Sequence, residues 1–205
     1  MQHREIEDQG LDKIWTIPNA LSALRIAGVP LFLWLVLQPY FGNSSLDFWA
    51  IGLLVLSGIT DYLDGKLARL WNQTSRLGRV LDPAADRLYT ISTLAALLLR
   101  GVIPWWFVVL LVARDVFMAG NIVALRRIGY GPLQVNFIGK AATFNLMYAF
   151  PLLLLTAGNG SVADIACIFG WALAIWGAAL YWWAAALYSV QVHRLRKERI
   201  TPAVK

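Results

Sequence analysis

Four aspartates stand close together in segments of the chain that are otherwise apolar. They are Asp61, Asp64, Asp82 and Asp86. An unpaired charge in apolar surroundings is costly, so a cation is expected beside them. Carboxylate oxygens without His or Cys favour hard divalent ions such as Mg²⁺ or Mn²⁺. Two such ions about 3.5–4 Å apart would suit a phosphoryl reaction, because they clamp the attacking and the leaving oxygen.

The spacing of the aspartates predicts that each pair shares one face of a helix. The first pair is separated by three residues and the second by four, which is one helical turn. Gly65 and Ala68 leave the surface beside the first pair bare, so a phosphorylated group can approach, and Arg69 can bind a phosphate. The alternative is a solvated salt-bridge cluster with neighbouring Lys and Arg residues. Asp82 could also simply cap a helix, but that role would not explain Asp86.

The composition excludes an ordinary soluble domain. Of the 205 residues, 59% are hydrophobic, which is typical of a protein embedded in a membrane. A helix needs about 20 residues to cross a bilayer. Apolar runs of this length begin near Ile17, Asp47, Arg79, Pro104, Phe137 and Val162. We therefore predict an all-α integral membrane protein with six transmembrane helices.

The basic residues predict the orientation of these helices. The net charge is +6, and a basic protein this hydrophobic is expected to face anionic lipid headgroups rather than nucleic acid. With both termini inside, Arg100 is the only basic residue in an outer connection, which satisfies the positive-inside rule. The N-in, C-in topology places the four aspartates on the cytoplasmic side. The first span is expected to be an uncleaved signal anchor, because the N-terminus lacks the apolar core of a signal peptide.

We expect one membrane domain, covering residues 16–193. Residues 1–15 form either a short helix on the inner leaflet or an unstructured lead. Residues 194–205 form a basic cytoplasmic tail. The single Cys167 excludes a disulfide within the chain.

The aspartate motif resembles the signature of a known family. It reads Asp61-x-x-Asp64-Gly65-x-x-Ala68-Arg69, then eight residues, then Gly78-x-x-x-Asp82-x-x-x-Asp86. This string is similar to the signature of the CDP-alcohol phosphotransferases at every fixed position. The resemblance implies that an alcohol attacks the phosphorus next to the lipid in CDP-diacylglycerol and releases CMP. It also implies two Mg²⁺ or Mn²⁺ ions on the four aspartates, with Asp86 also acting as general base, and a homodimer in a bacterial plasma membrane.

The resemblance further implies contacts with the CDP part of the substrate. Gly65, Ala68, Arg69 and Ser75 would make these contacts. Asn19 lies in a Pro-Asn pair that resembles a nucleotide-holding segment of the family. It also begins a polar stripe, completed by Ser22 and Arg25, that should face protein rather than lipid. The alternative is a helix cap at Asn19 followed by an arginine that extends to the membrane surface.

Four cations are predicted to bind the acceptor alcohol. Arg25 belongs to the first span, Arg114 and Arg126 to the fourth, and Lys140 to the start of the fifth. An arginine inside a membrane indicates function by default, and a phosphate on the acceptor would favour such a cluster. The alternative for Arg114 is a structural pair with a carboxylate on another helix.

The choice of acceptor depends on three local strings, at residues 81–87, 113–116 and 139–143. The first is similar to the glycerophosphate and cardiolipin branch of the family. The Arg-Asp pair in the second is more similar to cardiolipin-forming members than to those using glycerol 3-phosphate, whereas Arg87 departs from both patterns. We expect phosphatidylglycerol as the acceptor, giving cardiolipin and CMP, with glycerol 3-phosphate as the alternative.

Two other classes of protein could use four membrane carboxylates. An Asp-rich membrane prenyltransferase also activates a diphosphate through Mg²⁺, but more spans and no Asp-Gly-x-x-Ala-Arg string would be expected. A divalent-cation carrier would bind ions without catalysis. Neither class makes CMP, so metal-dependent release of CMP distinguishes both from a phosphatidyltransferase.

Overall fold

The predicted apolar runs all form helices. The computed structural model describes residues 17–41, 47–70, 78–127, 129, 137–158 and 160–200. Within these residues the helices are α2 (Ile17–Leu37), α3 (Asp47–Leu70), α4 (Gly78–Leu99), α5 (Trp105–Arg127), α6 (Phe137–Leu155) and α7 (Ser161–Ile200), with a short 3₁₀ helix η1 (Gln38–Phe41). Each α-helix begins within one residue of its predicted start, which confirms the all-α class. The predicted lead at residues 1–15 lies outside the described residues.

Four of the described helices are long and apolar enough to cross a membrane. These stretches are Asn19–Leu37, Trp105–Arg127, Phe137–Leu155 and Ser161–Lys197. Large apolar side chains also lie exposed on their surfaces, among them Trp34, Trp105 and Ile168, as expected for helices surrounded by lipid. The helices α3 and α4 have 24 and 22 residues, but the charges of the aspartate motif lower their hydropathy. The length and hydropathy of these four helices therefore identify the chain as a membrane protein.

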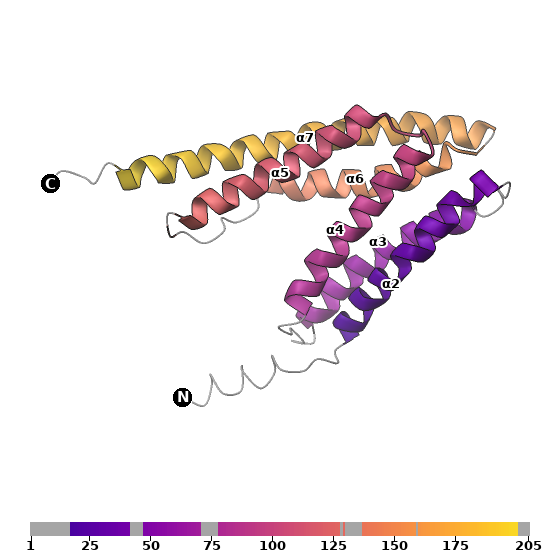
Figure 1. Ribbon diagram of the computed structural model, residues 1–205, viewed down its shortest axis with the longest axis horizontal. Helices are drawn as coiled ribbons and strands as arrows, with labels where there is room; N and C mark the ends of the chain where they lie inside the picture. Colours follow the sequence, from indigo (N-terminus) through magenta and orange to yellow (C-terminus); the bar gives the residue numbers. More distant parts are fainter. Residues whose placement is uncertain are drawn as a thin grey trace. The chain divides into compact units, whose positions relative to one another are not determined.

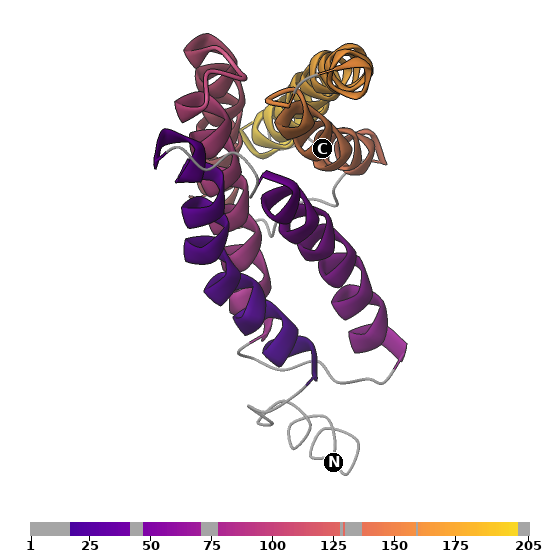
Figure 2. The same ribbon diagram turned by 90° about the vertical axis from the view of Figure 1, so that its right-hand side faces the viewer.

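The helices pack as two compact units, Met1–Val102 and Ile103–Lys205. In the first unit α2 packs against both α3 and α4, as Figures 1 and 2 show. The ring of Tyr89 on α4 stacks on that of Phe32 on α2, with centroids 5.6 Å apart. Its hydroxyl donates a hydrogen bond to the carbonyl of Leu53 on α3 at 3.2 Å. One buried tyrosine therefore joins all three helices of this unit.

In the second unit α7 packs against α5 and α6. The contact with α6 is close because α7 places small residues there, as membrane helices commonly do. A Cβ atom added at Gly170 would lie 3.1 Å from the backbone nitrogen of Leu153, and one at Gly177 would lie 3.1 Å from the side chain of Leu146. The buried alanines of α7 in this region are Ala163, Ala166, Ala174 and Ala178.

The predicted boundary between membrane domain and tail at residue 194 does not interrupt α7. This helix has 40 residues, which at 1.5 Å per residue is about 60 Å. Residues 191–200 contain no Gly or Pro, and the next helix breaker is Pro202. The helix therefore continues through the start of the basic tail, and it carries Arg194, Arg196 and Lys197 as exposed side chains.

The close contact between α6 and α7 gives a first prediction. Gly170→Leu should lower the melting temperature of the purified protein in detergent, because the added side chain meets the backbone of α6, which cannot give way locally. Overpacking of this kind typically costs about 1–3 kcal/mol. Circular dichroism during heating measures the effect. Gly52→Leu in α3 is the matched control, since no described atom lies within 4 Å of an added Cβ there; equal losses in both variants would contradict the assignment.

Candidate active site at the aspartate motif

The aspartate motif lies on two helices of the first unit, α3 and α4, which both pack against α2. Asp61 and Asp64 belong to the second half of α3, and Asp82 and Asp86 to the first turns of α4. Figure 1 shows the end of α3, the start of α4 and the start of α2 at the same end of this unit. The helical backbone separates the members of each pair by about one turn, as predicted. The side chains of Asp64 and Asp82 lie outside the described part of the structure.

Arg25 connects the two helices that carry the motif. Its Nη1 atom donates hydrogen bonds to Oδ1 of Asp61 and to Oδ1 of Asp86, both at 2.6 Å. The two oxygens are therefore separated by no more than twice this distance. The Arg25 side chain is 3% exposed, whereas the carboxylate side chains are 41% and 54% exposed. The buried guanidinium of Arg25 on α2 thus contacts two carboxylates that are themselves about half-exposed, so an incoming ion or substrate can reach them.

Asp61 and Asp86 are the two motif residues whose side chains the structure describes, and their positions suit a cation. Two carboxylates from different helices converge on a single positive charge, so they could supply two of the about six oxygen ligands that a hard divalent cation takes. Among the side chains that the structure describes, no three His, Cys, Asp or Glu residues gather at one point. Asp61 and Asp86 alone would supply two ligands, and the other two aspartates belong to the same helices. The residues therefore fit a metal held by carboxylates.

The polar stripe of α2 explains how Arg25 reaches this position. Asn19, Ser22 and Arg25 are all buried, so the predicted stripe faces protein. Because α2 begins at Ile17, Asn19 lies within the helix and does not cap it. Arg25 points to the carboxylates, and with only 3% of its side chain exposed it does not extend to solvent. Both parts of the alternative interpretation of this stripe are therefore wrong.

A second arginine joins the same three helices at the other end of the unit. Nη1 and Nη2 of Arg100 bind both carboxylate oxygens of Asp47 on α3, at 2.6 and 2.9 Å, and Nη1 also donates to the carbonyl of Val36 at 3.1 Å. Gly101, with φ of 67°, ends α4 here, and the amide of Val102 donates to the carbonyl of Leu97 at 2.9 Å. Arg100 was expected only as the one basic residue of an outer connection, and its pair with Asp47 was not predicted.

Arg114 occupies a different setting, in the second unit. Its Nη1 donates to Oδ1 of Asp115 at 3.1 Å and its Nε to the carbonyl of Tyr181 at 3.2 Å. The guanidinium carbon lies 3.5 Å from the centre of the Tyr181 ring, and the tyrosine hydroxyl donates to Oδ1 of Asp115 at 2.7 Å. This closed triad joins α5 to α7. It resembles the structural alternative for Arg114, except that the carboxylate is the adjacent residue on the same helix.

The remaining predicted residues are placed only in part. Arg126 at the end of α5 and Lys140 near the start of α6 are exposed in the second unit. Gly65, Ala68 and Arg69 lie in the last turns of α3, with side chains outside the described part. Ser75 lies outside the described residues. The structure thus brings together Asp61, Asp86 and Arg25, and these three define the candidate site.

Comparison with known proteins identifies the class to which this site belongs. The chain is a member of the CDP-alcohol phosphatidyltransferase family, whose profile matches residues 15–188. This match confirms the resemblance carried by the aspartate motif, and it covers both units.

Individual relatives are similar over most of the chain. A Streptomyces coelicolor protein named "Cardiolipin synthase (CMP-forming)" is 61% identical over 184 residues, covering 90% of this chain and 86% of that protein. A Cereibacter sphaeroides protein named "CDP-diacylglycerol--glycerol-3-phosphate 3-phosphatidyltransferase" is 35% identical over 155 residues, covering 74% and 69%. The human "Cardiolipin synthase (CMP-forming)" is 36% identical over 113 residues, covering 55% of this chain and 36% of that protein.

The Arg25 bridge gives a second prediction. Arg25→Gln should destabilise the protein by about 1.5–3 kcal/mol without divalent ions, because charged hydrogen bonds to two half-exposed carboxylates are lost. Adding Mg²⁺ or Mn²⁺ should then raise the melting temperature more in this variant than in the wild type, since the ion replaces the missing charge. Thermal denaturation with and without the ion measures both effects.

Arg100→Gln is the matched control, because Arg100 is also a buried arginine that joins the same three helices. It should lower the melting temperature without changing the gain from the ion. An equal gain in Arg25→Gln and the wild type would show that Arg25 does not share its carboxylates with a metal.

Proposed function

We propose that this protein transfers the phosphatidyl group of CDP-diacylglycerol to phosphatidylglycerol, producing cardiolipin and CMP. The observation that carries this proposal is the convergence of Asp61 and Asp86, from two helices, on one positive charge. The acceptor assignment rests on the 61% identity to a relative named as a CMP-forming cardiolipin synthase. The more distant relative named for glycerol 3-phosphate keeps that acceptor as the second candidate.

The proposed step is a substitution at phosphorus. The acceptor hydroxyl oxygen forms a bond to the phosphorus next to the diacylglycerol, and the bond from that phosphorus to the oxygen bridging to CMP breaks. Asp86 accepts the hydroxyl proton, and CMP leaves with the bond's electron pair. Asp86 suits this role because its side chain is 54% exposed, so an acceptor can reach it. Bound Mg²⁺ or Mn²⁺ would neutralise the diphosphate and stabilise the leaving oxygen.

The residues around the motif are assigned to the two substrates. We assign Asp61, Asp64, Asp82 and Asp86 to two metal ions, and Asn19, Gly65, Ala68, Arg69 and Ser75 to the CDP part. We assign Arg25, Arg114, Arg126 and Lys140 to the acceptor. The Arg25 contacts support a positioning role as well, because this residue holds the proposed base in place. Arg114 uses two N–H groups in its triad, which leaves others of its five for a ligand.

The proposed setting is a bacterial plasma membrane, crossed six times with both termini and the active site on the cytoplasmic side. The lengths of α3 and α4 support this count, because 24 and 22 residues extend about 36 and 33 Å, enough for a hydrocarbon core of about 30 Å. The pair between Arg100 and Asp47 supports it too, since it neutralises the charges at the outer end of this unit. We also propose that two copies of the protein form a homodimer.

The acceptor is the subject of a third prediction. Purified protein given CDP-diacylglycerol, Mn²⁺ or Mg²⁺ and phosphatidylglycerol should release CMP and form cardiolipin. Removal of the ions with EDTA should stop the release, and adding them back should restore it. Release of CMP with glycerol 3-phosphate but not with phosphatidylglycerol would transfer the assignment to the second candidate. If neither acceptor leads to release of CMP, the assignment as a phosphatidyltransferase is wrong.

The proposed base gives a fourth prediction. Asp86→Asn should lower turnover by a factor of about 10² to 10⁴, the usual contribution of a general base, while CDP-diacylglycerol still binds. Asp164→Asn is a matched control, because Asp164 is an exposed carboxylate in the first turn of α7. CMP release measures turnover, and binding of labelled CDP-diacylglycerol measures the first substrate. A wild-type rate in Asp86→Asn would exclude this residue as the base.

A further inference from the structure

Tyr89 lies one helical turn from the proposed base on the same face of α4. Asp86 and Tyr89 are separated by three residues, so their side chains leave the helix in similar directions. The side chain of Tyr89 is buried, with the residue 9% exposed. The hydroxyl of a buried tyrosine usually finds a hydrogen-bond partner, and here the partners belong to the other helix of the aspartate motif.

The hydroxyl of Tyr89 has two partners on α3. It donates a hydrogen bond to the carbonyl of Leu53 at 3.2 Å, and the side chain of Ser57 hydrogen-bonds to the same phenol group. Because a phenol has one hydrogen, which goes to Leu53, the Ser57 hydroxyl is the donor in the second bond. Leu53, Ser57 and Asp61 are each four residues apart and follow one face of α3. The two bonds therefore join α4 to the face of α3 that carries Asp61.

The ring of Tyr89 contacts the third helix of the unit. It stacks on the ring of Phe32 on α2, with centroids 5.6 Å apart. Phe32 lies seven residues after Arg25, which is about two turns of the same helix face. Arg25 itself is close enough to act electrostatically on the Tyr89 hydroxyl. Tyr89 thus connects the same three helices that Arg25 connects, at a level nearer the middle of the unit.

The two connections act differently on the carboxylates. Arg25 attracts Asp61 and Asp86 by its charge, which does not by itself restrict the spacing of the two helices. The hydrogen bonds of Tyr89 are directional, and one of them holds the backbone of α3. Two oxygens on one Mg²⁺ ion each lie about 2.0–2.1 Å from it, so they can be only about 4 Å apart. The spacing of α3 and α4 therefore bears directly on whether one ion can bind both carboxylates.

We propose that Tyr89 is a positioning residue of the candidate site. Its hydroxyl, bound to Leu53 and Ser57, sets the spacing of α3 and α4 at which Asp61 and Asp86 share a divalent ion. The inference rests on the metal-dependent reaction of the proposed function, and it assigns Tyr89 no contact with either substrate. A residue needed only for packing could be replaced by Phe without loss, because the ring and its stack would remain.

Tyr89→Phe tests the hydroxyl alone, since the ring is retained. The affinity for Mn²⁺ is measured on the purified full chain by electron paramagnetic resonance, well below the melting temperature, and CMP release is measured at saturating Mn²⁺. The variant should bind Mn²⁺ about three- to tenfold more weakly, the loss expected for one neutral hydrogen bond. Its kcat should fall by a similar factor, because the base is held less firmly, whereas KM for phosphatidylglycerol should stay unchanged.

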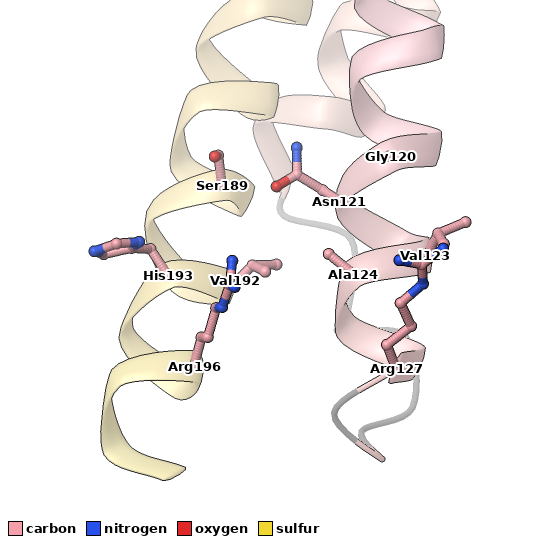
Figure 3. Close-up of a pocket in the computed structure, with 9 residues that line it drawn as sticks. All are labelled: Gly120, Asn121, Val123, Ala124, Arg127, Ser189, Val192, His193 and Arg196. Atoms are coloured by element: carbon pink, nitrogen blue, oxygen red, sulfur yellow. The ribbon is translucent and has the colours of Figure 1, made fainter. Parts of the chain in front are cut away.

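Tyr188→Phe is the matched control. Tyr188 is also a buried tyrosine, 6% exposed, and it packs with Val192 between α5 and α7. Val192 lines a pocket of about 520 Å³ between these two helices (Figure 3). In the described part of the structure the Tyr188 hydroxyl has no hydrogen-bond partner, so its removal should change neither Mn²⁺ affinity nor kcat. Arg100→Gln is a second control, because it loosens the first unit at its other end; it should lower the melting temperature and leave Mn²⁺ affinity unchanged.

A double-mutant cycle with Ser57→Ala separates one shared connection from general loosening. If the two hydroxyls act together, Tyr89→Phe and the double variant should lose equal Mn²⁺ affinity, whereas losses that multiply would contradict a single connection. A lower melting temperature in Tyr89→Phe with wild-type Mn²⁺ affinity and kcat would overturn the proposal, as would equal losses of Mn²⁺ affinity in Tyr89→Phe and Arg100→Gln. A wild-type chain that binds no Mn²⁺ would overturn the metal site and this inference together. One that binds Mn²⁺ and releases no CMP would contradict the proposed function, and the comparison of Mn²⁺ affinities would still decide the role of Tyr89.

Discussion

The first unit depends on the attraction between Arg25 and two carboxylates on different helices. Desolvated charges are stable only with a partner, and here one guanidinium nitrogen is the partner of both Asp61 and Asp86. The attraction pulls α3 and α4 toward α2 at the end of the unit that carries the motif. The positions of two predicted metal ligands are therefore set by a residue that does not belong to the family signature.

The packing between the helices extends this constraint along the unit. Phe32 and Tyr89 stack in the middle, and Arg100 bound to Asp47 joins the other end. Near the motif, Ser22 and Ala85 are fully buried, so small side chains let α4 approach α2 closely enough for Arg25 to reach Asp86. An ion pair at each end and an aromatic stack between them hold the carboxylates in one arrangement, which is what catalysis by positioning requires.

The sequence predicted the helices and the motif because both are local patterns. Long apolar runs determine where a membrane helix begins, and the spacing of Asp61, Asp64, Asp82 and Asp86 is visible without a fold. The partners of Arg25 and Arg100 could not be found in this way, since each pair joins residues far apart in the chain and depends on which helices pack together. The contacts that Tyr181 makes with Arg114 and Asp115 were missed for the same reason, because Tyr181 is more than 60 residues away in the chain. The continuation of α7 past residue 194 also has a local basis, because the sequence contains no Gly or Pro between residue 191 and Pro202.

The two units divide the chemistry of the proposed reaction. The motif belongs to α3 and α4 and would bind the diphosphate of CDP-diacylglycerol. The proposed acceptor contacts other than Arg25 belong to α5 and α6. The spacing of the four aspartates alone does not select the acceptor, because these residues would act on the CDP-linked substrate. The signature therefore identified the reaction class, whereas the acceptor had to be argued from short strings in both units and from whole-chain similarity.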